Sequence, residues 1–159
     1  MPFYGSQEWD PKLIVAQIVA LQCLSYITYG MLLSLFHTLF GTAFTLEQFF
    51  GYQSVDAGAP TGWVVILSSL SNAVVSAVFL SLIVERAKKC LDFAFTNHVL
   101  HLIFCTLYES FPSNWEWWVL DVASMIILAV VGEYLCMRRE LREIRISDFL
   151  STRNPSSTV

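Results

Sequence analysis

Four long apolar runs decide what this chain can fold into. They cover approximately residues 13–36, 63–84, 91–111 and 117–137, and each is almost free of charged side chains. A helix of about 20 apolar residues crosses the roughly 30 Å hydrocarbon layer of a bilayer. A helix on a soluble core keeps a polar face instead. The sequence therefore predicts an all-α polytopic membrane protein, a bundle of four transmembrane helices.

The composition points the same way. Of the 159 residues, 55% are hydrophobic and 14% are charged, whereas a soluble domain has roughly 45–50% and about 25%. The chain shows no basic patch of the kind that binds nucleic acid. The first run is also longer than the roughly 7–15 apolar residues of a signal peptide. We expect a retained first helix, and the lipid bilayer rather than nucleic acid as the surroundings.

Basic residues gather on one predicted side of the membrane. Residues 85–89 hold three bases and the segment after Met137 holds five, while residues 41–62 and 109–116 hold none. Short loops rich in Lys and Arg stay in the cytoplasm. Both termini and the joint at 85–89 are therefore predicted to be cytoplasmic, with the two acidic loops on the lumenal side.

The predicted domain covers residues 1–146, and its last helix extends past Met137 into the cytoplasm. Residues 138–145 are good helix formers. Residues 147–159 have the composition of a disordered cytoplasmic tail. The last three, Ser157, Thr158 and Val159, match the short, weak pattern of a ligand for domains that capture a C-terminal carboxylate.

Polar side chains inside the spans are costly and mark candidate functional sites. The expected intramembrane polar cluster consists of Asn97, His98, His101 and Asp121. A structural alternative is that these groups join the third and fourth helices by hydrogen bonds, for example from His98 to Glu133.

The spacing His98-x-x-His101 puts two imidazoles on one face of a helix. The third histidine, His37, falls near the far end of the first helix, too distant to share a metal or haem. We therefore expect no metal and no cofactor. The chain also lacks a Gly-x-Ser-x-Gly motif, and we expect no enzymatic activity.

A transporter or proton relay stays open as an alternative. Asp121, His101, His98 and Glu133 together span the third and fourth helices. Against it, four short helices leave little room for a lined cavity, and no span is interrupted by Pro or paired Gly, as transporter helices often are.

The four cysteines lie in or at the ends of the spans, so we expect no disulfide framework. Cys90 and Cys136 fall at the cytoplasmic border, where palmitoylation is one option. The other is that they are small buried thiols.

Five short motifs follow one another along the chain: W-D-P at 9–11, K-C-L-D-F at 89–93, H-x-x-H at 98–101, W-W at 117–118, and G-E-Y-L-C-M at 132–137 with E-L and E-I just beyond. In this order and spacing they resemble the Sys-one family of small four-helix Golgi membrane proteins. The resemblance covers roughly residues 8–146.

The resemblance implies a multi-pass protein of the Golgi or trans-Golgi membrane, without enzymatic activity. It implies a receptor that recruits an Arf-like, Arf-related GTPase and so supports vesicle trafficking and protein transport. The GTPase carries an N-terminal acetyl group instead of a myristoyl chain. Since even one myristoyl chain gives only marginal membrane binding, such a GTPase needs a protein receptor.

We expect the receptor surface at the cytoplasmic border. A carboxylate buried there, from Asp92 or Glu133, would accept N–H groups at the N-terminus of an incoming helix. The candidate partner-binding residues are Asp92, Glu133, Arg138, Glu140, Leu141 and Ile144.

Overall fold

The computed structural model describes residues 11–84 and 86–153. Within them the elements are α1 (Pro11–Phe40), α2 (Glu47–Phe50), a 3-10 turn η1 (Tyr52–Ser54), α3 (Pro60–Val84), α4 (Ala87–Tyr108) and α5 (Trp115–Arg153). No strand occurs in this part of the chain. Residues 9 and 10 of the W-D-P motif and the C-terminal residues 157–159 lie outside it.

The four predicted spans fall within α1, α3, α4 and α5, except for the end of the third. All four helices are long and apolar enough to cross a membrane, so the predicted all-α, four-span fold is confirmed. α4 ends at Tyr108 rather than at residue 111. The reason is local: the residue before Pro112 is sterically disfavoured in a helix.

The last helix is longer than predicted. α5 continues past Met137, as expected, but it also runs through the start of the predicted disordered tail and ends at Arg153. Between Gly132 and Pro155 the sequence holds neither Gly nor Pro, the two residues that most strongly interrupt a helix. The difference concerns residues 147–153; residues 154–159 lie outside the described part.

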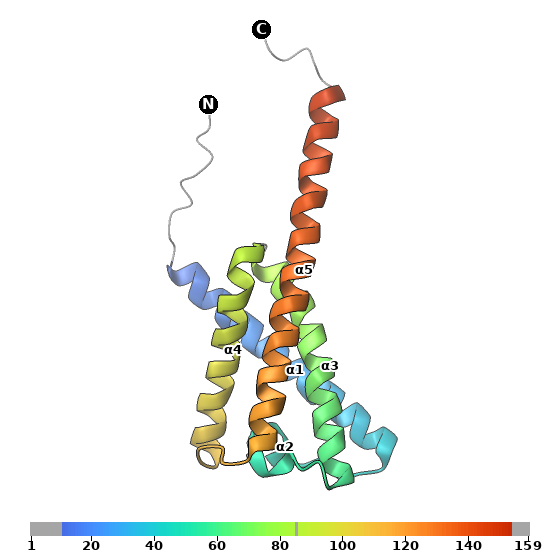
Figure 1. The fold of residues 1–159 in the computed structure, drawn as a ribbon, viewed down its shortest axis with the longest axis vertical. Coiled ribbons are helices and arrows are strands. Elements are labelled where there is room, and N and C mark those ends of the chain that lie inside the picture. The colour runs from blue at the N-terminus through green and yellow to red at the C-terminus, as the bar shows by residue number, and fades with distance from the viewer. Residues whose placement is uncertain (1–10, 85, 154–159) are drawn as a thin grey trace.

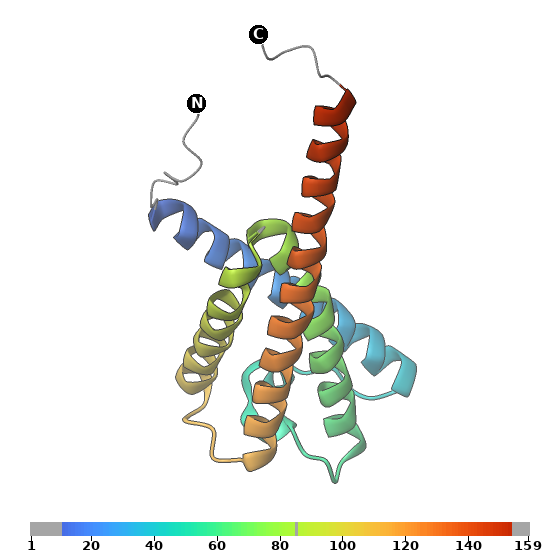
Figure 2. The ribbon, with the colours of Figure 1, turned by 45° about the horizontal axis from the view of Figure 1, so that its top comes forward.

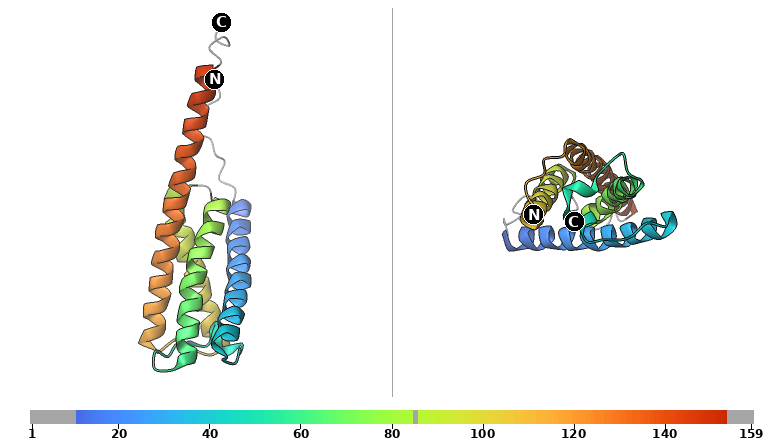
Figure 3. Two further views of the ribbon diagram at one scale, coloured as in Figure 1. Left: turned by 90° about the vertical axis from the view of Figure 1, so that its right-hand side faces the viewer. Right: turned by 90° about the horizontal axis from the view of Figure 1, so that it is seen from below.

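The helices form one bundle in which α3 packs between α1 and α5, and α4 packs along α5 (Figure 1). α1 crosses obliquely over α3 and α4, as the view from below shows (Figure 3). α5 projects beyond the bundle as a single rod (Figure 2). The start of α1, the α3–α4 joint and the projecting part of α5 lie at the same end.

We call this end the basic end, because it carries Arg86, Lys88 and Lys89 and the arginines of α5. The opposite end, where residues 41–59 and 109–114 turn, is the acidic end. The start of α1 and the end of α5 thus lie on one side of the bundle. That this side faces the cytoplasm stays a prediction from the basic residues.

Glycine allows a close contact between α5 and α3. A Cβ atom on Gly132 of α5 would lie 2.7 Å from Cδ2 of Leu80 on α3, closer than van der Waals contact permits. Around this point Leu80, Leu128, Cys90 and Cys136 form a buried core at the basic end. Small residues let membrane helices approach closely in this way.

The loop between α1 and α3 folds back against the bundle. α1 ends at Phe40, and the next residue, Gly41, has a φ of 65°, which favours glycine. Beyond it, Phe49 and Val55 pack against a core at the acidic end that includes Tyr29. The Tyr29 hydroxyl donates to the Gln48 carbonyl at 3.2 Å. The sequence shows this segment only as an acidic loop; in the structure it closes one end of the bundle.

Candidate functional site

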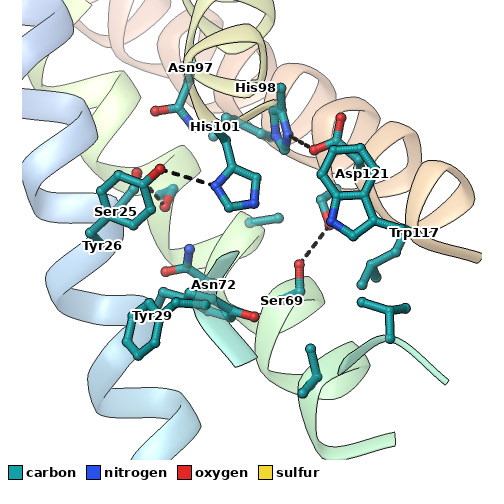
Figure 4. A pocket seen from close by; sticks show the side chains of 18 of the residues that line it. Ser25, Tyr26, Tyr29, Ser69, Asn72, Asn97, His98, His101, Trp117 and Asp121 are labelled. Carbon is teal, nitrogen blue, oxygen red and sulfur yellow. Dashed lines mark hydrogen bonds and ion pairs between the residues drawn. The ribbon is translucent and has the colours of Figure 1, made fainter. Parts of the chain in front are cut away.

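A polar cavity lies inside the bundle, between α1, α3, α4 and α5 (Figure 4). Its volume is about 80 Å³. A buried water occupies roughly 10–15 Å³ on this measure, so the cavity has room for about five waters. Residues of the folded-back loop, including Gln48 and Phe49, line it from the acidic end.

The four side chains of the predicted intramembrane cluster all line this cavity. They are Asn97, His98 and His101 on α4 and Asp121 on α5 (Figure 4). His98 Nδ1 donates to the Asp121 carboxylate at 2.9 Å, and the two side chains are only 13% and 15% exposed. The structure therefore places all four side chains of the predicted cluster around one cavity.

The suggested pairing of His98 with Glu133 is wrong. Its partner is Asp121, which lies on the helix beyond the turn between α4 and α5. Counting from the turn they share places His98 about 15 Å from the end of α4, and Asp121 about 9 Å from the start of α5. The His98 and Asp121 side chains span the remaining offset along the helices. Glu133 lies three turns further along α5.

His101 binds different partners from His98. Its Nδ1 lies 3.1 Å from the Tyr26 hydroxyl, and its Nε2 lies 3.5 Å from Cys105 Sγ. Its ring stacks on Trp117 with 6.2 Å between ring centroids. The two imidazoles are therefore engaged separately. Among the described residues, no group of three or more His, Cys, Asp and Glu side chains is placed to hold a metal ion.

Two buried oxygen atoms in the cavity wall have no hydrogen-bond partner within the described chain. They are Gln22 Oε1 and Asn97 Oδ1. Leaving a buried acceptor unpaired costs about 1–3 kcal/mol. Both atoms are almost inaccessible to solvent in this structure, so the cavity wall holds two buried acceptors that the described chain leaves unpaired.

The walls contributed by α1 and α3 were not predicted. Ser25 Oγ lies 3.0 Å from Ser76 Oγ, and Thr28 donates to Asn72 Oδ1 at 2.7 Å. A signal existed: Gln22 and Ser25 are three residues apart in an apolar run, and so share a helix face. Identifying the facing side of α3 required the packing.

At the basic end, Asp92 and Glu133 are both exposed. Asp92 lies two residues, or about 200° around α4, from the fully buried Cys90. The expected buried carboxylate is therefore not present. Its place on the inner face is filled by Cys90, Phe93 and Ala94. A role for Asp92 and Glu133 in partner binding stays a prediction.

The other candidate partner-binding residues lie on the part of α5 nearest the bundle. Glu140 Oε1 accepts the Ala87 N–H at 3.1 Å, which ties α5 to the start of α4. The Arg138 guanidinium lies 5.4 Å from the centre of the Tyr134 ring. Leu141 and Ile144 are 62% and 57% exposed. The structure thus anchors this segment by Glu140 and leaves two apolar side chains on its surface.

Cys90 and Cys136 are buried thiols. Their sulfur atoms lie 3.2 Å apart across the α4–α5 contact, and neither residue is exposed. Both are free cysteines in the described chain. An acyltransferase cannot reach either thiol in this fold.

Comparison with known proteins identifies a family over nearly the whole chain. The family SYS1, described as an integral membrane protein S linking to the trans Golgi network, matches residues 4–146. This confirms the resemblance seen in the sequence motifs. No solved structure matches the chain.

Curated relatives of this chain come from several different organisms. A protein SYS1 homolog of Nematostella vectensis is 40% identical over 151 residues, 95% of this chain and 96% of the relative. A homolog of Dictyostelium discoideum is 42% identical over 142 residues, 89% of this chain and 61% of the relative. Protein SYS1 of Saccharomyces cerevisiae is 33% identical over 136 residues, 84% of this chain and 66% of the relative. With four helices able to cross a membrane, the chain belongs to the SYS1 family of multi-pass proteins of the trans-Golgi network membrane.

Proposed function

We propose that this chain recruits an Arf-like small GTPase to trans-Golgi membranes through its basic end, and that it does so without catalysing a reaction. The observation that carries the proposal is the continuation of α5 beyond the bundle (Figure 2). It presents a rigid surface at the end that the basic residues predict to be cytoplasmic.

The apolar part of this surface is the pair Leu141 and Ile144. Residues three apart lie on one face of a helix, and the two side chains stand about 6 Å and 10 Å beyond Met137. They are well exposed. An amphipathic segment of a GTPase that binds lipid only marginally gains affinity by covering them.

The acidic part lies on the side of α5 that faces α4. Glu133 and Glu140 are seven residues apart, so they fall within about 20° of each other around the helix. Glu140 already contacts the first turn of α4, while Glu133 is exposed. Carboxylates here attract basic side chains or the positive N-terminal end of a partner helix.

Relocation tests the proposal. The chain is fused to a mitochondrial outer-membrane anchor, and the Arf-like GTPase is imaged in the same cells. The GTPase is expected to follow the chain to mitochondria. A GTPase that stays in place would refute recruitment. Resistance to protease serves to show that the relocated chain is folded.

Variants then locate the surface. Leu141→Ala with Ile144→Ala, and separately Asp92→Asn with Glu133→Gln, are expected to lower recruitment about tenfold while the chain still reaches the Golgi. The matched controls are Val130→Ala, an exposed residue within the span, and Glu47→Gln at the acidic end. Normal recruitment by both test variants would show that this face is not the receptor surface.

A polar cavity in the membrane favours one second candidate, a pathway for protons or a small polar solute. His98, His101 and Asp121 line it, whereas Glu133 does not. Purified chain in liposomes with an internal pH dye distinguishes the two functions. Proton flux above that of protein-free liposomes, lost in Asp121→Asn, supports a pathway. Absence of flux in a preparation that still binds the GTPase excludes it.

A further inference from the structure

Besides the internal cavity, a surface groove lies at the basic end, on the side of α5 opposite Glu133 and Glu140. It opens between the last turns of α3 and the point where α5 leaves the bundle, and its volume is about 460 Å³. It is lined by three arginines, three apolar side chains and one serine: Arg138, Arg139, Arg142, Val78, Leu135, Leu141 and Ser81. No Asp or Glu belongs to this lining among the described residues.

We propose that this groove binds the phosphate headgroup of an anionic phospholipid from the surrounding leaflet. The groove combines positive charge with apolar walls at the level where a membrane span ends. That is the level at which lipid phosphates meet the hydrocarbon layer. An anionic lipid offers a phosphate to the arginines and the upper part of an acyl chain to Val78 and Leu135.

Two of the arginines are held in place by the fold. Arg139 Nη1 donates to the Ser81 carbonyl at 2.6 Å, which fixes its side chain across the end of α3. Arg138 lies over the Tyr134 ring. A guanidinium that stacks by its face still directs its N–H groups outward in its own plane, and these bind phosphate in pairs.

The third arginine completes the set. Arg142 is one helical turn beyond Arg138, on the same face of α5. The acid Glu140 follows Arg139 in the chain but points to the other side of α5, toward α4. There its side chain accepts a hydrogen bond from the Ala87 N–H. The positive charge of the groove is therefore not cancelled by this neighbour, and it is complementary to a lipid phosphate.

Native mass spectrometry of the full chain, purified in a neutral detergent, tests the proposal without any GTPase. Phosphatidylserine or phosphatidylcholine is added at equal concentration. We expect one phosphatidylserine to be retained preferentially. The Arg138→Gln/Arg142→Gln variant is expected to bind it roughly 25-fold more weakly, about fivefold for each arginine.

The matched control is Lys88→Gln/Lys89→Gln, which removes two exposed charges from the same end but outside the groove. It is expected to change the affinity less than twofold. If the glutamine variant does not fold, Arg138→Lys/Arg142→Lys keeps the charge and removes the planar donors, and a severalfold loss is expected. Unchanged affinity in that variant overturns the proposal.

Three further results would also overturn it. Equal retention of phosphatidylcholine, which also carries a phosphate but no net charge, shows that an anionic headgroup is not selected. An equal loss in the Lys88 and Lys89 control shows diffuse attraction rather than a site. Displacement of the lipid by millimolar inorganic phosphate shows a site for free phosphate instead of a lipid.

Discussion

His98 on α4 and Asp121 on α5 are joined by a hydrogen bond of 2.9 Å inside the bundle. The residues are 23 positions apart in the chain and lie on opposite arms of the α4–α5 hairpin. The bond fixes the register of the hairpin and forms one wall of the polar cavity. In an apolar bundle, a polar contact of this kind has few alternatives, so it specifies which residues of the two helices face each other.

Replacing Asp121 by alanine is expected to lower the free energy of unfolding by about 1–2 kcal/mol. The change removes the acceptor of His98, and interhelical hydrogen bonds in membrane proteins contribute this order of energy. Denaturant unfolding of the purified chain in detergent gives the measurement. The control Asp92→Ala removes an exposed acid near the start of α4 and is expected to change stability by less than about 0.5 kcal/mol. Equal effects of the two variants would contradict the contact.

The close approach of α5 to α3 depends on Gly132. Gly132→Leu forces side-chain atoms into the space of Leu80 and is expected to cost about 1–3 kcal/mol or more. In a Leu80→Ala background the cavity accommodates the new side chain. The double variant is therefore expected to be more stable than the sum of the single effects, by about 1–3 kcal/mol. Additive effects in the same unfolding assay would show that the two residues are not in contact.

Cys90 and Cys136 are expected to carry no acyl group in the native protein, because the α4–α5 contact buries both thiols. Thioester exchange followed by peptide mass spectrometry measures this at each cysteine. Both thiols are expected to react with a maleimide only after unfolding. A Lys88→Cys variant supplies an exposed thiol at the same end and serves as the positive control. A thioester found on Cys90 or Cys136 would mean that this contact opens in the cell.

The folded-back loop is expected to depend on Gly62. A Cβ at this position would overlap the Asp56 carbonyl oxygen, so Gly62→Ala must displace the loop from the start of α3. Hydrogen exchange of residues 47–59 is expected to become faster. Gly58→Ala is the matched control, since its Cβ would meet only the side chain of Asp56, at 3.1 Å, and no backbone atom. Unchanged exchange in Gly62→Ala would show that the loop does not pack as described.

The four spans could be predicted because a bilayer imposes a simple requirement. Each crossing needs about 20 apolar residues with all backbone hydrogen bonds made inside the helix. Pro112 explains why α4 ends at Tyr108, a few residues before the predicted end of the third span at residue 111. The extension of α5 to Arg153 was underestimated because the composition of residues 147–153 is polar, and polarity alone does not stop a helix.

The polar residues could be selected from the sequence, but their partners could not. Asn97, His98, His101 and Asp121 stood out because polar groups in a span are costly, and all four line the cavity. The partner of His98 depends on the offset between α4 and α5, which the sequence of neither helix contains. The exposure of Asp92 and Glu133 likewise depends on how each helix is rotated.

The sequence by itself determined that this chain is a four-helix membrane protein of the SYS1 family, with its bases gathered at one end of the spans and none in the loops at the other. Only the tertiary structure decided that His98 bonds to Asp121, that the loop after α1 closes a polar cavity, and that arginines of α5 meet the end of α3 in a groove. The physical reason is that these two levels of structure depend on contacts of different range along the chain. Hydrophobicity along the chain sets where helices form, whereas helix rotation and offset are set by contacts between side chains that are far apart in sequence.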